Sequence, residues 1–377
     1  MKFKIPFIKP VMPNAREISR AYETIVESNW FTNFGPQEQN FSKKLEDFIG
    51  QQTHVATVAN ATLGLVLAVK ALMIPRKTDT KTKVLIPSFT FAAVAEAIEW
   101  CGLKPVFVDI NEKSWQMKLP EAEQYVNDHP DEVVGIIFCN VFGVGAPEID
   151  NWEKLATKHN LPLVIDSAAG FGSRYKDGYL LGARGDCEIF SFHATKPFGI
   201  GEGGAIVGRS KKLITKLKSL ENFGFNDKRE VNDIGLNGKL QEINAAIGLW
   251  RLTNIESSVT QRQQVQQMFI DKLSPLGYVF QDNTNQSSVC FVSALAKDQN
   301  QASRAFRALR SSGVEANRYY NPALHKQSAF KKYERAMSLS TTDDICSRVL
   351  SLPAHHEVSK KVLHNIVSII EKSERTL

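Results

Sequence analysis

The segment Cys187-Glu-Ile-Phe-Ser-Phe-His-Ala-Thr-Lys196 is the most informative stretch of the chain, because a short apolar strand pattern ends there abruptly in polar residues and a lysine. A second strand pattern, Leu161-Pro-Leu-Val-Ile-Asp166, ends in the same way, with an acid where the apolar run stops. In an open α/β sheet, ligands bind at the carboxyl ends of the strands. We therefore expect Lys196 and Asp166 to belong to one site.

A lysine and an aspartate in one site match two requirements of pyridoxal phosphate (PLP). This cofactor needs a lysine amine to hold its aldehyde as a Schiff base, an acid facing its pyridine nitrogen, and a cradle for its phosphate. Lys196 fits the first requirement and Asp166 the second. A lysine released by substrate and held out of water can also act as base and acid. We interpret these two residues as catalytic.

Each residue also has an ordinary interpretation. A lysine after a strand is most often a solvated strand end, and an acid there is often the N-cap of a helix. The PLP interpretation therefore depends on a phosphate cradle elsewhere in the chain.

Small polar residues in Val58-Ala-Asn60-Ala61-Thr62-Leu-Gly-Leu65 supply a candidate cradle, since an apolar segment that reads as a buried helix follows them. Backbone N–H groups at a helix start bind anions well, and the Thr62 hydroxyl would add to them. Ser191 offers a second hydroxyl. Asn60 or Thr62 could equally be a plain N-cap.

Another predicted strand end, Ile86-Pro-Ser-Phe-Thr-Phe91, places an aromatic ring at the same edge of the sheet. Phe91 could lie flat on the pyridine ring, or it could be an ordinary core residue. Periodicity alone favours neither interpretation.

Composition is typical of a globular protein with a large core. The chain has 377 residues, of which 43% are hydrophobic and 23% charged, and this length favours two domains. The formal charge of +6 comes from 46 basic and 40 acidic residues. This excess is spread along the chain, so it suits small anionic substrates and argues against nucleic acid.

The five cysteines contain no C-x-x-C pair, and the eight histidines show no metal-ligand spacing. We therefore expect a cytoplasmic protein without a metal. The apolar stretch at the N-terminus is too short for a signal peptide, and no segment approaches the roughly 20 apolar residues of a membrane span.

Strand and helix patterns divide the chain into two parts. Short β-rich runs alternate with amphipathic segments over residues 84–207, which predicts a mostly parallel sheet flanked by helices. A helix is expected over residues 239–252, and an α+β pattern follows it. We predict a large domain at residues 1–250 and a smaller C-terminal domain at 251–377.

The segment Gly199-Ile-Gly201-Glu-Gly-Gly204 formally satisfies the G-x-G-x-x-G pattern of dinucleotide-binding proteins. That pattern requires a strand just before it and a helix just after it. Here the glycines follow the lysine turn and lead into another strand pattern, so a nicotinamide dehydrogenase is disfavoured. We expect the glycines to let the backbone pass close to the cofactor, with Glu202 fixing the loop.

Taken together, the motifs resemble those of the DegT/DnrJ/StrS family of nucleotide-sugar aminotransferases, which are PLP enzymes of fold type I. The similarity covers nearly the whole chain, and the motifs come in the order of the family. They are Asn33-Phe-Gly-Pro36, Asn60-Ala-Thr62, Pro87-Ser-Phe-Thr-Phe91, Lys104-Pro-Val-Phe-Val-Asp109, Phe142-Gly143, Ile165-Asp-Ser-Ala168, Ser191-Phe-His-Ala-Thr-Lys196, Glu202-Gly-Gly204, Gly235-Leu-Asn-Gly-Lys239, Glu242-Ile-Asn-Ala-Ala-Ile-Gly-Leu249 and Leu350-Ser-Leu-Pro353.

The resemblance implies a role for each matching residue. Lys196 would be the Schiff-base lysine, Asp166 the partner of the pyridine nitrogen, and Phe91 the stacking ring. The phosphate would be held by Ala61, Thr62 and Ser191, and by Asn237 of a neighbouring subunit. The resemblance thus implies a homodimer with shared active sites.

Substrate contacts are less well defined. The cluster Asn317-Arg318-Tyr319-Tyr320-Asn-Pro-Ala-Leu-His325 combines a cation, two phenols and an imidazole, and the resemblance places it near the sugar nucleotide. Packing of the domain seam is an equally good interpretation. We take Lys239, Arg318, Tyr319 and His325 as candidate substrate residues.

Three departures from the family pattern stand out. Ala169 replaces a His or Gln that many members place against the cofactor ring, and Asn237-Gly-Lys239 replaces Asn-Tyr-Arg. A histidine common before the Tyr-Gly turn is replaced near Asn140. The Ser-Phe-His-Ala-Thr-Lys and Asn-Gly-Lys versions resemble a subset that aminates the C4 carbonyl of the sugar.

The resemblance implies transfer of an amino group from L-glutamate to a keto-6-deoxyhexose carried on a nucleoside diphosphate, with dTDP as the expected carrier. Some family members carry histidine at the lysine position and dehydrate the sugar, but this chain has Lys196. Dehydration of the sugar and a PLP-binding regulator without turnover remain the alternatives.

Overall fold

Two β-sheets organise the structure, a computed structural model that describes residues 3–375. The large sheet has seven strands in the order β1-β7-β6-β5-β4-β2-β3, and the small sheet has three in the order β10-β9-β8. The strands are β1 (His54–Val58), β2 (Lys83–Pro87), β3 (Lys104–Val108), β4 (Val133–Cys139), β5 (Leu163–Asp166), β6 (Cys187–Ser191), β7 (Gly204–Gly208), β8 (Val279–Phe280), β9 (Val292–Leu295) and β10 (Val349–Leu352).

The large sheet is parallel except for β7. The pairs β3/β2, β2/β4, β4/β5 and β5/β6 are parallel, and β7 runs antiparallel to both of its neighbours, β6 and β1. Strands buried on both faces read as continuous apolar runs, and every residue of β4 is buried. This arrangement brings the carboxyl ends of β4, β5 and β6 to one edge of the sheet.

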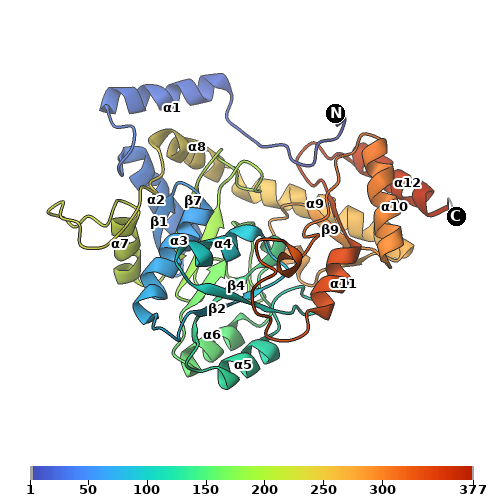
Figure 1. The fold of residues 1–377 in the computed structure, drawn as a ribbon. Helices are drawn as coiled ribbons and strands as arrows, with labels where there is room; N and C mark the ends of the chain where they lie inside the picture. Colours follow the sequence, from blue (N-terminus) through green and yellow to red (C-terminus); the bar gives the residue numbers. More distant parts are fainter. Residues whose placement is uncertain (1–2, 376–377) are drawn as a thin grey trace.

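Helices cover both faces of the large sheet (Figure 1). One core lies under α3, α4 and α7, and the other lies under α2, α5, α6 and α8. Ile137 of β4 belongs to the first core, whereas its neighbours Ile136 and Phe138 belong to the second, as the strand period of two requires. The helices are α1 (Ala15–Ser28), α2 (Pro36–Ile49), α3 (Ala61–Leu72), α4 (Ala92–Trp100), α5 (Leu119–Asp128), α6 (Ile149–Lys158), α7 (Lys211–Leu220), α8 (Glu242–Leu252), α9 (Ile255–Leu273), α10 (Gln299–Ser311), α11 (Ser340–Arg348) and α12 (Lys360–Arg375).

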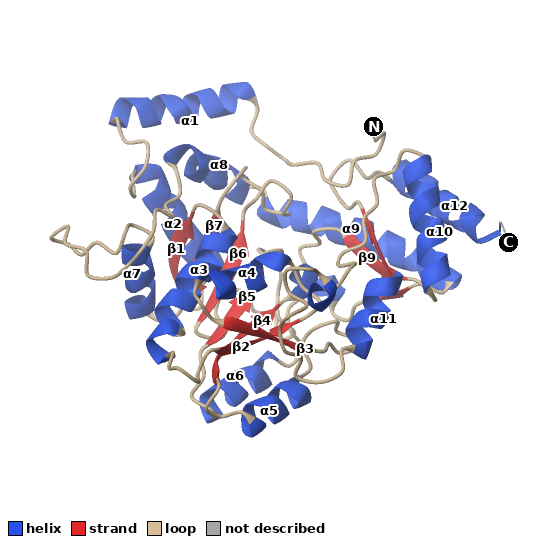
Figure 2. Ribbon diagram, in the orientation of Figure 1, coloured by secondary structure: helices blue, strands red, loops and turns tan. Residues whose placement is uncertain are grey.

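The small antiparallel sheet packs with α9, α10 and α12 around a third core, to one side of the large sheet (Figure 2). The N-terminal segment joins this part of the molecule, because Ile5 forms a parallel bridge with Val314 and the Phe7 N–H donates to Glu315 Oε2 at 2.8 Å. The Pro6 carbonyl lies 3.0 Å from His355 Nε2. The first residues described are therefore attached to the C-terminal part of the chain.

The predicted fold class is confirmed: a mostly parallel sheet flanked by helices, followed by a smaller α+β part. The predicted helix over residues 239–252 begins later, at Glu242. The Glu242 carboxylate accepts hydrogen bonds from the N–H groups of Gln37 and Glu38 at 2.7 and 2.8 Å, so it also caps α2. The boundary at residue 250 falls inside α8 and stays a prediction.

Within residues 3–375, no helix has the length and apolarity that a membrane crossing requires. All five cysteines are free thiols. The same residues contain no group of three or more His, Cys, Asp or Glu side chains arranged to hold a metal ion.

Candidate active site

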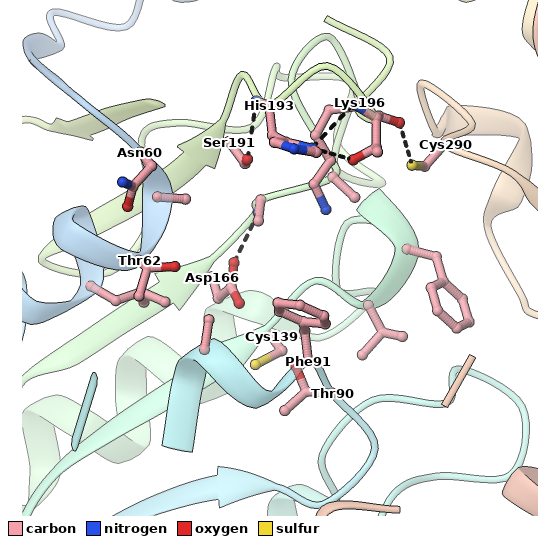
Figure 3. A pocket seen from close by; sticks show the side chains of 18 of the residues that line it. Asn60, Thr62, Thr90, Phe91, Cys139, Asp166, Ser191, His193, Lys196 and Cys290 are labelled. Atoms are coloured by element: carbon pink, nitrogen blue, oxygen red, sulfur yellow. Dashed lines mark hydrogen bonds between the residues drawn. The ribbon is translucent and has the colours of Figure 1, made fainter. Parts of the chain in front are cut away.

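A cavity of about 670 Å³ opens at the carboxyl ends of β4, β5 and β6 (Figure 3). It contains most of the side chains that the sequence predicts for one site. These are Ala61, Thr62, Phe91, Asp166, Ser191, Lys196 and Tyr319. The strand ends predicted to share a site therefore meet at one cavity.

Asp166 ends β5 and lies on the wall of the cavity beside Cys139, its register partner on β4 (Figure 3). Its Oδ1 accepts a 2.9 Å hydrogen bond from the Ala168 N–H. Burial raises the pKa of the carboxyl above its ordinary value, and the Ala168 N–H and the charge of Lys196 partly offset that rise. A cationic group placed against Asp166 would stabilise its ionised form.

Lys196 sits on a hairpin-like loop over residues 192–203 that joins β6 to β7. The Ala194 N–H donates to the Gly201 carbonyl and the Ile200 N–H to the Phe192 carbonyl, both at 2.8 Å. The Lys196 N–H donates to the His193 carbonyl at 2.9 Å, which closes a tight turn. Its side chain extends from this turn into the cavity (Figure 3). The glycine-rich segment is thus the return arm of the loop and leads into β7, as the sequence predicts.

The N-terminus of α3 forms the candidate anion cradle. Asn60 is the N-cap, because its side chain accepts from the Leu63 N–H at 2.9 Å. The N–H groups of Ala61 and Thr62 come before the first intrahelical bond, which Gly64 donates to Asn60. A Cβ added to Gly204 would lie 3.0 Å from the Ala61 nitrogen, so glycine permits the close approach of β7 to this helix start.

Phe91 is the N-cap residue of α4 and is 59% exposed, although it lines the cavity. The core interpretation of this ring is therefore wrong for the structure. A large apolar ring left open at a cavity wall is suited to cover a flat ligand.

A buried polar network supports the turn after Asp166. Glu188 of β6 is fully buried and accepts from the Ser167 and Tyr175 hydroxyls at 2.7 and 3.0 Å, and from the N–H groups of Gly182 and Arg184. Asn140, which lines the cavity, donates to the same two hydroxyls. Burial raises the pKa of Glu188, and its four donors partly offset the rise.

Four predicted site residues lie outside the cavity lining, among the residues that the structure describes: Asn237, Lys239, Arg318 and His325. Arg318 donates from Nε to the Val349 carbonyl at 3.2 Å, and His325 Nδ1 lies 2.7 Å from the Ser88 hydroxyl. These contacts join segments distant in sequence, as the packing interpretation requires.

Asn237 is exposed on a surface loop, and Lys239 donates to its Oδ1 at 2.8 Å. The Lys239 ammonium also lies 4.8 Å from the centre of the Phe223 ring. Burial lowers the pKa of Lys239, which the nearby charge of Glu221 partly offsets. Lys239 therefore orients Asn237 in the single chain.

Several lining residues were not expected from the sequence, notably Cys139, Cys290, Phe7 and Ile8. Cys139 ends β4, so the strand-end rule applied to every strand would have found it. The others reach the cavity through tertiary packing, for which the sequence carries no local signal.

The residues present fit PLP. Asp166 is a buried carboxyl suited to a cationic ring nitrogen, the start of α3 with Ser191 is suited to a phosphate, and Phe91 offers a flat apolar face. Lys196 enters the same cavity with an amine. When bound, PLP supplies an electron sink for the bond that breaks in an amino acid.

Comparison with known proteins agrees with this class. The profile of the DegT/DnrJ/EryC1/StrS aminotransferase family matches residues 14–371. A putative PLP-dependent aminotransferase from Bacillus cereus has a similar structure, with a TM-score of 0.91 and 30% identity over 97% of this chain and 99% of that one. Fold and site therefore define a PLP-dependent aminotransferase of fold type I.

Curated relatives cover nearly the whole chain. Protein Rv3402c of Mycobacterium tuberculosis is 42% identical over 98% of this chain and 90% of its own length. The dTDP-4-amino-4,6-dideoxy-D-glucose transaminase of Shigella dysenteriae is 32% identical over 97% of both. The chain belongs to the DegT/DnrJ/EryC1/StrS aminotransferase family.

Proposed function

We propose that this enzyme transfers an amino group from L-glutamate to C4 of a dTDP-linked keto-6-deoxyhexose, in the cytoplasm and for amino-sugar biosynthesis. The observation that carries the proposal is the placement of Lys196 and Asp166 on the wall of one cavity, with an anion cradle beside them. The transaminase of Shigella dysenteriae, whose name contains a dTDP-linked 4-amino sugar, supports the choice of substrate.

The residues of the chain have separate tasks in this reaction. The Asp166 carboxylate pairs with the positive charge on the ring nitrogen of the cofactor. The start of α3 and Ser191 bind the phosphate of the cofactor. Lys196 takes a proton from the carbon of the amino donor and returns one to the sugar carbon that receives nitrogen. Phe91 and the buried floor of the cavity exclude water.

We also propose a homodimer in which each site is completed by the partner. The bases that line the cavity, among the residues described, are Lys196 and His193, whereas Glu96, Asp166 and Glu202 are acids. A nucleoside diphosphate needs cationic partners that this lining does not offer. The loop that carries the exposed Asn237 and the largely buried Lys239 in a second copy is the proposed source, and Arg318 and His325 are left as packing residues.

Absorbance spectroscopy followed by product analysis tests the proposal. The purified enzyme with PLP should show a visible band that bleaches with L-glutamate and returns with a dTDP-linked 4-keto-6-deoxyhexose. NMR of the product should show an amine at C4, and a UDP-linked sugar serves as the comparison. A band that no amino donor bleaches would favour the non-catalytic alternative, and a product that has lost water without gaining nitrogen would favour dehydration.

A further inference from the structure

The imidazole of His193 is held in one tautomer by its own loop. The Thr195 N–H donates to His193 Nδ1 at 3.2 Å, and the Thr195 hydroxyl lies 2.7 Å from the same nitrogen. A backbone N–H can only donate, so Nδ1 is the acceptor and a neutral ring carries its proton on Nε2. Figure 3 shows the ring of His193 beside Lys196 at the cavity.

The carboxylate of Glu202 faces the other ring nitrogen. Its Oε1 lies 3.5 Å from His193 Nε2, and both residues line the cavity. The two strands of the loop set this distance, since His193 forms a bridge with Gly201, and Asn244 donates to the Glu202 carbonyl. At 3.5 Å the carboxylate orients the imidazole ring. The Nε2–H group is still available to donate to another acceptor, because good hydrogen bonds of this kind are about 2.9 Å long.

The proposed chemistry requires a donor at this place. When a primary amine condenses with a ketone, the nitrogen bonds to the carbonyl carbon and the carbonyl oxygen leaves as water, with both protons taken from the nitrogen. Negative charge develops on the oxygen as the new bond forms, and a fixed N–H donor stabilises it. Lys196 acts on carbon protons, so the oxygen needs another group.

We propose that His193 is a catalytic residue that donates a hydrogen bond from Nε2 to the carbonyl oxygen of the keto substrate. Thr195 fixes the tautomer, and Glu202 is the positioning residue that orients the ring. The inference rests on the proposed function, because it needs a ketone as the amine acceptor. Asn140 is unsuited to this task, since its amide donates to Ser167 and Tyr175 and accepts from Ala146.

Two substitutions separate the donor from the shape of the ring. His193→Phe keeps an aromatic ring without a donor, and we expect kcat with the keto sugar to fall about a hundredfold, as for the loss of one oxyanion donor. His193→Gln restores an N–H of similar reach and should recover at least a tenth of the wild-type rate. His129→Gln is the matched control, because His129 also pairs with a glutamate, Glu132 at 2.9 Å, but lies on the C-cap of α5.

Nitrogen NMR of the full-length protein labelled at histidine provides a readout that does not depend on turnover. We expect the His193 signal to show the Nε2–H tautomer in wild type and to keep it in Thr195→Ala, because the backbone N–H of residue 195 still donates to Nδ1. The proposal is overturned if His193→Phe keeps more than a third of the wild-type kcat, if His193→Gln is no better than His193→Phe, or if the ring carries its proton on Nδ1. Failure of the wild type to aminate any keto sugar would instead contradict the proposed function.

Discussion

Arg251 of α8 donates a 2.8 Å hydrogen bond from Nη2 to the carbonyl oxygen of Pro197, the residue after Lys196. The guanidinium is buried, 5.8 Å from the centre of the Phe198 ring, and its Nε has no partner among the described residues. Burial, with the charge of Arg262 nearby, lowers the pKa of Arg251 to about 10. The loop that carries Lys196 is thus anchored to the buried guanidinium of Arg251, which makes only part of its possible hydrogen bonds.

Arg251→Met should reduce activity more than stability. Loss of the hydrogen bond and relief of the buried charge oppose each other, so we expect the free energy of unfolding to change by less than about 2 kcal/mol. The loop loses its anchor, and kcat should fall about tenfold, since small misplacements at a reacting centre are costly. Arg209→Met, which removes a surface bond to the Ala183 carbonyl, is the control. Wild-type kcat in Arg251→Met would refute the anchoring role.

Asp166→Asn should stabilise the protein without cofactor at neutral pH. Burial raises the pKa of Asp166 in the folded state, so the folded protein binds this proton more tightly than the unfolded chain. The stability contributed by the group is therefore present below its ordinary pKa of about 4 and is lost as pH rises through the folded value. Thermal denaturation at pH 4 and pH 7.5 should show a gain in Tm only at the higher pH. An equal gain at both would mean that the charge is not the cause.

Glu188 offers a matched pair of substitutions. Glu188→Ala leaves the Ser167 and Tyr175 hydroxyls and two backbone N–H groups without an acceptor, and should cost about 3–5 kcal/mol. Glu188→Gln keeps one carbonyl oxygen for three of these donors, and should cost no more than about 1 kcal/mol. Urea denaturation measures both values. Equal losses in the two variants would show that the packing of the side chain, rather than its hydrogen bonds, carries the stability.

Lys196→Ala tests the covalent role of the lysine. Borohydride reduction of the wild type with PLP should fix the cofactor on residue 196, which peptide mass spectrometry detects. The variant should bind PLP without this attachment and should lose at least a thousandfold in turnover, because the lysine both holds the cofactor and moves the proton. Turnover close to wild type in the variant would contradict the assignment.

Asn237→Ala tests the shared site. We expect weaker retention of PLP, measured by dialysis and absorbance, because the proposed dimer loses one phosphate contact per site. Dimers mixed from Asn237→Ala and Lys196→Ala chains should regain part of the activity, since one of their two sites then has both residues intact. Complete absence of rescue, with mixed dimers verified by native mass spectrometry, would show that each chain is self-contained.

Residues at strand ends are the part of the site that can be predicted from the sequence. Asp166, Ser191 and Lys196 follow apolar runs whose direction in a parallel sheet is fixed, so their shared edge is a consequence of topology. Ala61 and Thr62 reach the same place because a helix start must follow β1 on that side. These positions needed no knowledge of distant packing.

The substrate side of the cavity was less predictable. Tyr319 lines the cavity, whereas Arg318 next to it turns away to the carbonyl groups of Ser347 and Val349, at the end of α11 and the start of β10. Adjacent residues of a loop diverge according to contacts made by chain far away in sequence. The same reason hid Phe7 and Cys290, which reach the cavity through packing of the C-terminal part.

Phe7 and Ile8 form part of the cavity wall while the residues just before them are attached to the C-terminal sheet region. Phe7 and Ile8 therefore form a piece of the pocket that no strand or helix of the large sheet constrains. Libraries randomised at these two positions are expected to reshape acceptor preference without disturbing the lysine loop.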